Sequence, residues 1–402
     1  MAFVAPAGTP ISPLTFAVSL ARGWTSSAEI PLGEGLAAHA GHRRYWLVST
    51  GRAAMVLALQ AMRDVCKDAQ RVEVIVPAYT CYSVPASVIK AGLKPRLCDV
   101  DPTSLSLDPD ALRKFDFSRV LAIVTANLYG IPNHLQSIEA IARAQGVWML
   151  DDSAQALGAT LEGRPVGGFG DVGLYSFDKG KNITSLEGGA LVASHPELSA
   201  ALDRRHAALA PASATRTATT IVKLAAYATL LRPTLYGVVR KLPGLGLGRT
   251  VYDETYPVER YSGTLAGFAG TLLKRLPVLT GGRRDKAAAL RAELSKVPGL
   301  RLIESPPNSQ PAYARYPFLM TDATQRAAVL EKLEAAGIGA TASYPSALGD
   351  VPEVARHLPA TDLEMPGARQ VADTIVTLPT HAYAPANLPS RAAASIRAVL
   401  AK

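Results

Sequence analysis

Two acidic residues and a lysine are the side chains of this sequence best suited to chemistry. Asp151 and Asp152 follow the apolar run Val147–Leu150, and Lys181 comes 29 residues after Asp152 in a loop that closes at a Gly-Gly pair. A carboxylate at the end of a buried strand is costly without a partner, and a neutral lysine is a nucleophile. Each also has an ordinary explanation, because Asp is a common helix N-cap and most loop lysines are solvated surface charges.

A candidate anion site precedes them in the chain. Gly51 stands before a helix-like stretch that begins near Arg52. The backbone amides of Arg52 and Ala53 would then point at an anion, because the first N–H groups of a helix lack partners within it. A plain turn at Gly51 is the alternative.

The elements that must position these residues alternate between strand and helix from Tyr45 to about Ser194. Strand-like runs lie at 73–76, 95–99, 120–124, 147–150 and 190–192, and helix-like stretches lie at 52–62, 84–91 and 135–144. Runs that are apolar on both faces indicate an α/β fold with a mostly parallel sheet, covered by helices on both sides. Sites in such sheets lie at the carboxyl ends of the strands, where the acidic pair stands.

The pattern changes after Pro196. Residues 201–257 show no strand–helix alternation and form an excursion from the sheet, which is apolar and basic, without an acidic residue, over 216–249. Amphipathic helical patterns begin at Leu265, and two short strand-like runs follow at 301–303 and 316–319.

Length and composition bound the class of protein. The 402 residues are enough for two or three domains of about 150 residues. We expect an N-terminal arm at 1–30, a large domain at 31–262 and a smaller C-terminal α/β domain at 263–402. With 48% hydrophobic and 19% charged residues, the chain is not mainly disordered.

Cysteine usage and apolar patterning give the expected compartment. Three cysteines without a CxxC pair argue against a disulfide framework or a structural zinc site, so we expect a reducing, cytoplasmic setting and no metal. No apolar run reaches the roughly 18 residues of a membrane span, and the N-terminus lacks the basic start of a signal peptide. The net charge of +9 alone decides nothing, and we expect no nucleic-acid partner.

Several spaced motifs resemble one known family. They are EVIVPAYT (73–80), AGLKPRLCDVDP (91–102), LYGIP (128–132), DDSAQALGA (151–159), SFDKGKNITSLEGG (176–189) and TLPTH (377–381). The chain resembles the DegT/DnrJ/EryC1/StrS sugar aminotransferases, which are pyridoxal-phosphate (PLP) enzymes of fold type I, from about Thr50 to Leu388.

The resemblance implies a role for each matching residue. Lys181 matches the lysine that forms the Schiff base with PLP, and Asp152 matches the carboxylate that keeps the pyridine nitrogen protonated. Gln155 matches the residue held against the cofactor ring and its 3′-oxygen, and Ser176 matches the phosphate-binding hydroxyl. The anion at Gly51, Arg52 and Ala53 would then be the cofactor phosphate, and Asp151 would be structural.

The sequence departs from the family pattern at the cofactor site. Arg52 replaces the usual Thr, so a hydroxyl contact is lost, although a guanidinium could replace it by charge. Cys81 stands where an aromatic ring commonly stacks on the cofactor; Tyr82 or Tyr79 could serve instead, or the thiol simply packs there.

Two further departures concern Asn127 and the subunit interface. Asn127 replaces the histidine of the usual His-Leu-Tyr-Gly. The family's Asn-x-Arg, which reaches the neighbouring subunit's phosphate, aligns with Val258 and Arg260, so the arginine is kept and the asparagine lost. The resemblance implies a homodimer with Arg260 at the partner's cofactor.

The expected function is amino transfer from a donor such as glutamate to a keto group of an activated, nucleotide-linked sugar, in cell-surface polysaccharide or secondary-metabolite biosynthesis. A lipid-linked or non-sugar substrate is one alternative. The family's dehydratases carry histidine in place of Lys181, and a non-catalytic sensor would have lost Lys181 or Asp152. A Rossmann domain is disfavoured because no G-x-G-x-x-G follows an early strand.

The excursion has two interpretations. It is a helical hairpin that packs against a dimer partner, or a basic amphipathic segment that makes peripheral contact with an anionic membrane. The basic residues of its 216–249 stretch are Arg216, Lys223, Arg232, Arg240, Lys241 and Arg249.

Overall fold

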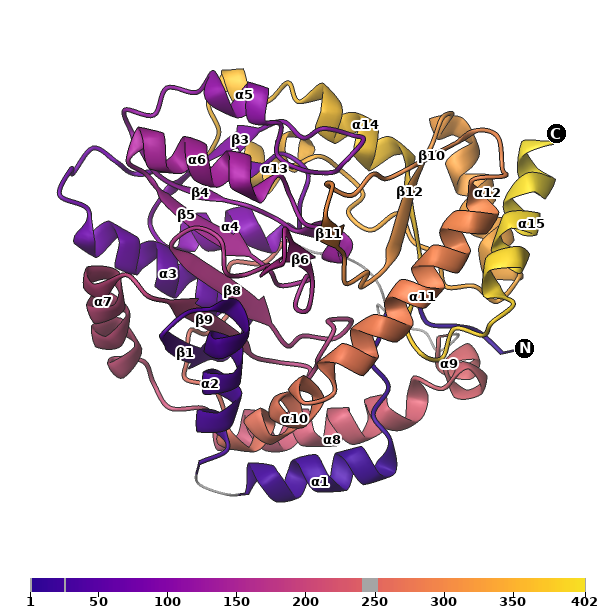
Figure 1. The fold of residues 1–402 in the computed structure, drawn as a ribbon, viewed down its shortest axis with the longest axis horizontal. Coiled ribbons are helices and arrows are strands. Elements are labelled where there is room, and N and C mark those ends of the chain that lie inside the picture. Colours follow the sequence, from indigo (N-terminus) through magenta and orange to yellow (C-terminus); the bar gives the residue numbers. More distant parts are fainter. Residues whose placement is uncertain (1, 25–26, 241–251, 402) are drawn as a thin grey trace.

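A seven-stranded sheet forms the centre of the computed structural model, which describes residues 2–24, 27–240 and 252–401 (Figure 1). Its spatial order is β1 (Arg44–Val48), β9 (Gly189–Ala193), β8 (Val172–Ser176), β5 (Trp148–Asp152), β4 (Val120–Val124), β2 (Glu73–Pro77) and β3 (Lys94–Cys98). The strands from β8 to β3 pair in parallel, whereas β9 is antiparallel to both β8 and β1. The predicted mostly parallel sheet is confirmed, and β1 and β8 are strands that the sequence pattern did not indicate.

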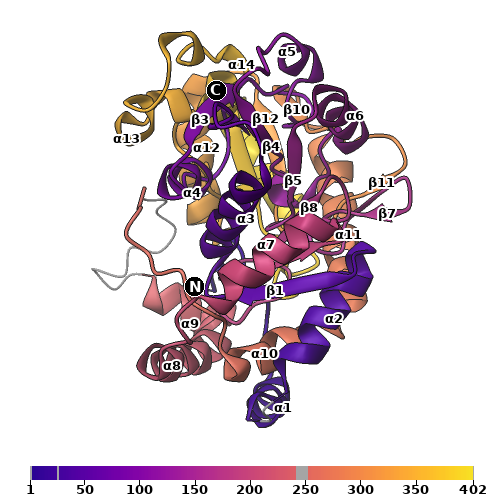
Figure 2. The same ribbon diagram turned by 90° about the vertical axis from the view of Figure 1, so that its left-hand side faces the viewer.

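Helices cover both faces of this sheet (Figures 1 and 2). One face packs against α3 (Gly51–Val65), α4 (Ser83–Lys90) and α7 (Pro196–Ala207). The other face packs against α5 (Pro109–Arg113) and α6 (Leu135–Gln145) near β4, and against α2 (Glu29–Ala40) and α10 (Gly263–Leu273) near β9. Successive residues of a strand point to opposite faces of the sheet. In β2, Val74 and Val76 therefore pack in the core that contains α3 and α4, whereas Ile75 packs in the core that contains α5 and α6.

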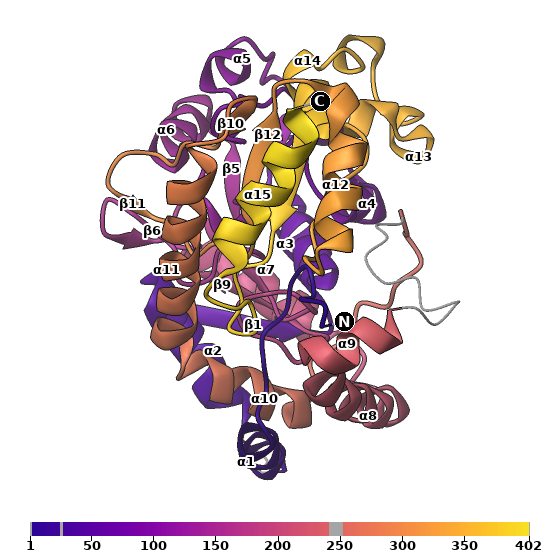
Figure 3. The same ribbon diagram turned by 90° about the vertical axis from the view of Figure 1, so that its right-hand side faces the viewer.

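The C-terminal part has a sheet of its own. It consists of β10 (Leu300–Leu302), β12 (Tyr316–Met320) and β13 (Ile375–Leu378), against which α11 (Leu276–Leu294), α12 (Arg326–Ala335) and α15 (Leu388–Leu400) pack (Figure 3). A small sheet of β11 (Ser309–Gln310), β6 (Thr160–Leu161) and β7 (Arg164–Pro165) links the two parts. The expected domain boundary at residue 262 stays a prediction. The helix that begins just after it, α10, shares a hydrophobic cluster with α2 of the large part.

The edge strand β3 is closed by the C-terminal part, which contributes α13 (Pro352–Ala355) and α14 (Pro366–Thr374) on this side. The buried Asp362 carboxylate accepts hydrogen bonds from Arg96 Nε (2.7 Å) and from the outward N–H of Leu97 (3.0 Å). Just beyond the strand, Asp99 accepts two N–H groups from the first turn of α14 (both 2.8 Å). These bonds fix the two parts to each other.

The excursion contains α8 (Ala214–Leu230) and α9 (Pro233–Val239), while Lys241 and Arg249 lie outside the described residues. Figure 1 shows α8 beside α1 (Pro13–Gly23) and α10. Arg240 is already paired with Glu334 (2.5 Å) and lies over the ring of Phe3. In the part of the chain that the structure describes, no helix is long and apolar enough to cross a bilayer.

Candidate active site

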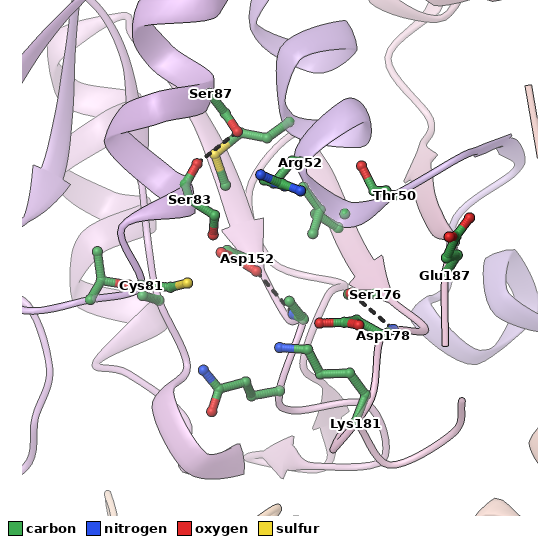
Figure 4. A pocket seen from close by; sticks show the side chains of 18 of the residues that line it. Thr50, Arg52, Cys81, Ser83, Ser87, Asp152, Ser176, Asp178, Lys181 and Glu187 are labelled. Carbon is green, nitrogen blue, oxygen red and sulfur yellow. Dashed lines mark hydrogen bonds between the residues drawn. The ribbon is translucent and has the colours of Figure 1, made fainter. Parts of the chain in front are cut away.

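A cavity of about 550 Å³ lies at the carboxyl ends of the parallel strands, where the acidic pair was expected (Figure 4). It is bounded by the ends of β5 and β8, the β8–β9 loop, the first turn of α3 and the segment before α4. The predicted residues that line it are Gly51, Arg52, Cys81, Asp152, Gln155, Ser176 and Lys181. Ala53 and Arg260 do not line it.

Lys181 lies in the loop between β8 and β9, and its side chain points into the cavity (Figure 4). The N–H of Phe177 donates to the carbonyl of Gly188 (2.9 Å), and that of Lys181 donates to the carbonyl of Asp178 (3.2 Å). Gly180 precedes Lys181 with a φ of 82°, a conformation that glycine adopts without steric cost. The loop thus presents one amino group to the cavity.

Asp152 ends β5 and is 8% exposed. Burial raises the pKa of its carboxyl to about 6, against the opposing effects of a hydrogen bond from Ala154 N–H and the charge of Lys181. The Ala154 N–H binds Oδ1 at 2.9 Å, and Oδ2 has no hydrogen-bond partner among the described residues. One carboxylate oxygen is therefore free to accept a hydrogen bond from a ligand.

Asp151 is fully buried and faces the protein instead. Its Oδ1 accepts from Asn127 Nδ2 (2.7 Å), and its Oδ2 accepts from the N–H groups of Gly167 (2.6 Å) and Phe169 (3.4 Å). Burial raises the pKa of this carboxyl even so. These partners support the structural role expected for Asp151, which joins β5 to the 167–169 turn.

Asn127 and Gln155 hold the wall beside the acidic pair. Asn127, in place of the family's histidine, also donates to the carbonyl of Asp152 (2.9 Å). Gln155 accepts from the N–H of Tyr129 through Oε1 and donates to the hydroxyl of Tyr344 through Nε2, both at 3.0 Å. Because both ends of its amide are fixed, Gln155 is a rigid part of the cavity wall.

The first turn of α3 and Ser176 lie together at one end of the cavity. A Cβ on Gly51 would lie 3.0 Å from Ser176 Cβ, so glycine allows the helix to begin close to this hydroxyl. Thr50 caps the helix, because its Oγ1 accepts from the N–H of Ala53 (3.0 Å). The Ala53 amide predicted to face an anion therefore already has a partner within the helix cap.

Arg52 does not stand free at this end. Its Nη1 lies 2.8 Å from Asp253 Oδ2, and its guanidinium lies 4.2 Å from the ring centroid of Tyr256. Hydrogen bonds from Thr255, and then from Arg52, lower the pKa of Asp253 to about 2. A carboxylate thus neutralises the arginine that was expected to compensate for the family's threonine.

Cys81 lines the cavity, and among the described lining residues there is no aromatic side chain. Tyr79 is fully buried, with its hydroxyl 3.4 Å from both the hydroxyl of Tyr129 and the carbonyl of Tyr344. Tyr82 is 6% exposed and does not line the cavity either. Of the three residues considered for this position, Cys81 alone lines the cavity, and ring stacking by Tyr79 or Tyr82 stays a prediction that the lining does not support.

The backbone of Arg260 forms a β-bridge with Val48, two residues before the Thr50 that lines the cavity. Its Nη2 donates to the carbonyl of Ala207 (2.6 Å), and its exposed side chain is outside the cavity of its own chain. Its expected contact with a neighbouring subunit stays a prediction.

Charged residues that the sequence did not indicate also line the cavity. They are Asp178, Glu187, Arg216 and Asp253. Arg216 Nε lies 2.8 Å from Glu187 Oε2, which joins the start of α8 to the loop of Lys181. Asp178 and Glu187 lie inside the SFDKGKNITSLEGG motif and could have been found there, whereas Arg216 and Asp253 carry no local signal.

Comparison with known proteins agrees with this geometry. The model of the DegT/DnrJ/EryC1/StrS aminotransferase family matches residues 24–220 and 261–387. The chain belongs to this family. It is 29% identical to the L-glutamine:scyllo-inosose aminotransferase of Streptomyces griseus over 82% of this chain and 76% of that protein.

Other relatives match over shorter stretches or in fold. The L-glutamine:2-deoxy-scyllo-inosose aminotransferase of Streptomyces kanamyceticus is 36% identical, but the match spans 40% of this chain and about a third (36%) of that protein. The crystal structure of the aminotransferase TlmJ from Streptoalloteichus hindustanus has a TM-score of 0.76 at 25% identity, over 99% of both chains. Helicobacter pylori PseC, an aminotransferase of pseudaminic acid biosynthesis, shares the fold with a TM-score of 0.80, at 18% identity and 99% coverage of both chains.

Proposed function

We propose that the protein is a PLP-dependent aminotransferase that moves an amino group from an amino-acid donor, such as glutamate or glutamine, to the keto group of a sugar or a sugar-like cyclic polyol. The observation that carries this proposal is the cavity in which Lys181 and the buried Asp152 meet the first turn of α3. Family membership and the names of the relatives support the reaction class.

The residues present fit the cofactor. Asp152 Oδ2, which has no partner among the described residues, can accept a hydrogen bond from a protonated ring nitrogen. At the other end, Ser176 and the N-terminus of α3 suit a phosphate, because helix N-termini favour anions. Cys81 and Gln155 also line the cavity.

Each of these residues has a defined task. Bound PLP supplies an aldehyde that reacts with amines and a ring that accepts electrons from an adjacent carbanion. Asp152 holds a negative charge at the ring nitrogen, and Lys181 in its neutral form accepts and returns a proton at Nζ. Asp178 places a carboxylate near that amino group.

The charges of the cavity favour an uncharged acceptor. In the described part of the chain, both arginines that line the cavity are ion-paired, Arg52 with Asp253 and Arg216 with Glu187. A nucleotide-linked sugar, the acceptor expected from the sequence, would have to displace these carboxylates with its diphosphate. We therefore propose a keto-polyol without phosphate as the acceptor and keep the nucleotide-linked sugar as the second candidate.

Borohydride trapping followed by peptide mass spectrometry tests the reaction class. We expect the cofactor mass on the peptide that contains Lys181, and its loss in Lys181→Ala. Lys179→Ala is the matched control, because Lys179 is exposed in the same loop and does not line the cavity. Cofactor on another lysine would contradict the assignment.

A half-reaction separates the two acceptors. The enzyme is first charged with glutamate or glutamine and then mixed with a keto-inositol or with a nucleotide-linked keto-sugar. Faster discharge by the keto-inositol is expected, and faster discharge by the nucleotide-linked sugar would favour the second candidate.

A further inference from the structure

The first stretch of the N-terminal arm, residues 2–11, passes between the C-terminal part and the excursion. On the side of the excursion, the N–H of Phe3 donates to the carbonyl of Pro233, the first residue of α9 (2.8 Å). On the side of the C-terminal part, the N–H of Val4 donates to the carbonyl of Gly337 and the carbonyl of Val4 accepts from the N–H of Gly339 (both 2.9 Å). His381 Nε2 lies 2.8 Å from the carbonyl oxygen of Ala5. The arm is thus fixed on both sides before it reaches Thr9.

Thr9 connects this arm to the loop of Lys181. Its side chain has no solvent exposure, and its Oγ1 donates to the carbonyl of Lys181 at 2.6 Å, with the carbonyl of Asn182 at 3.2 Å. Its N–H donates to the hydroxyl of Tyr227 on α8 (2.8 Å). One buried residue therefore joins the excursion to the backbone of the proposed catalytic lysine.

Arg283 on α11 fixes the same hydroxyl from the other side. It is 3% exposed and donates to Thr9 Oγ1 (3.1 Å), to the carbonyls of Gly8 (2.8 Å) and Ala314 (3.1 Å), and to Thr380 Oγ1 (3.2 Å). No carboxylate among the described residues pairs with it, and burial lowers its pKa to about 10, so it stays charged at neutral pH. A buried cation that donates to a hydroxyl strengthens the hydrogen bond that this hydroxyl donates in turn.

The loop needs such an anchor. Gly180 stands directly before Lys181 in a left-handed conformation, and glycine leaves the backbone free to adopt others. A Cβ on Gly180 would lie 3.2 Å from the Cβ of Ala7, so the arm also packs against this glycine.

We infer that Thr9, held by Arg283 and Tyr227, is a positioning residue that fixes the backbone of Lys181 and so aims its amino group into the cavity. This inference rests on the proposed function for the catalytic meaning of Lys181. The contacts themselves connect α11, α8 and the arm to the loop whatever the cavity binds.

Thr9→Val tests the inference because it keeps the shape and removes the hydroxyl. Thr9→Ser restores the hydroxyl, and Thr280→Val is the matched control, since Thr280 is 2% exposed and its Oγ1, as far as the described residues go, bonds only within its own helix, to Leu276 (2.9 Å) and Pro277. The first measurement is hydrogen exchange in the peptide that covers 177–188, on the cofactor-free protein. We expect about 10-fold faster exchange in Thr9→Val, and wild-type rates in Thr9→Ser and Thr280→Val.

The second measurement uses the holoenzyme. Thr9→Val is expected to lower kcat by about 10-fold to 100-fold with little change in KM, and to change the pH at which the visible absorbance of the bound cofactor titrates. Thr9→Ser should restore both.

The two failures can be told apart. Unchanged loop exchange in Thr9→Val would overturn the inference even if Lys181 binds the cofactor. Faster loop exchange in Thr9→Val, together with a wild-type protein that carries no cofactor on Lys181, would support the anchor and refute the proposed function.

Discussion

Asp152→Asn is the change whose effect the structure predicts in most detail. The carboxyl pKa of Asp152 is raised from 3.8 to about 6, mainly by burial. Each pKa unit is worth about 1.4 kcal/mol, so the ionised carboxylate costs the cofactor-free protein about 3 kcal/mol of folding free energy. Because the native state binds more protons than the unfolded state between pH 4 and 6, this cost develops as the pH rises through that window and is complete above it.

Asparagine has nearly the same shape, can still accept the Ala154 N–H, and carries no charge. We therefore expect cofactor-free Asp152→Asn to be more stable than the wild type at pH 8, by up to about 3 kcal/mol, with the gap closing towards pH 4. Urea unfolding of both proteins at several pH values measures this difference in stability. With PLP bound the order should reverse, and kcat should fall by about 100-fold or more, because the charge at the ring nitrogen is lost.

Asp151→Asn is the control, because it should lower the stability of the cofactor-free protein where Asp152→Asn raises it. Both oxygens of Asp151 accept hydrogen bonds, so an amide would place its NH₂ against a donor such as the N–H of Gly167. This variant should lose about 1–3 kcal/mol of stability. Two results would refute the reasoning. One is a difference in unfolding free energy between Asp152→Asn and the wild type that does not change with pH, and the other is an Asp152→Asn protein less stable than the wild type at pH 8.

Three further predictions follow from the site and the excursion. Lys181→Ala should abolish turnover while Lys179→Ala keeps it, as steady-state assays would show. The protein should sediment as a homodimer, and Arg260→Ala should weaken PLP binding in equilibrium dialysis; an active monomer would remove this role. If the excursion docks on membranes, low-salt flotation with anionic vesicles should recover the dimer and high salt should release it. Charge reversal at Lys223 should weaken that binding, whereas a protein that never floats leaves α8 as a helix packed on its own chain.

The sheet was largely readable from the sequence because its parallel strands are buried on both faces. The run at 120–124 is apolar throughout and the run at 73–76 is apolar after Glu73, and the structure has strands at nearly those bounds. β1 was missed because RYWLV begins with an exposed arginine, and β8 because its glycine and its final serine interrupt the apolar pattern.

The site was predictable where one motif carries it and not where distant segments meet. Asp152, Gln155 and Lys181 lie within two neighbouring motifs, and the fold brings them to one cavity. The pairing of Arg52 with Asp253 joins residues about 200 positions apart, so no local pattern reveals it. The cap on Ala53 was the local signal that was overlooked, since Thr50 is a preferred N-cap residue directly before the helix.

The contact between Asp362 and β3 also bears on how the chain is made. Edge strands with open N–H groups are templates for pairing with other chains, and a carboxylate on Leu97 N–H closes this one. Asp362 comes more than 260 residues after β3, so during synthesis the N–H of Leu97 stays without this partner until those residues have been made. Over that interval, a nascent chain that has formed β3 is exposed to pairing with other chains through this edge.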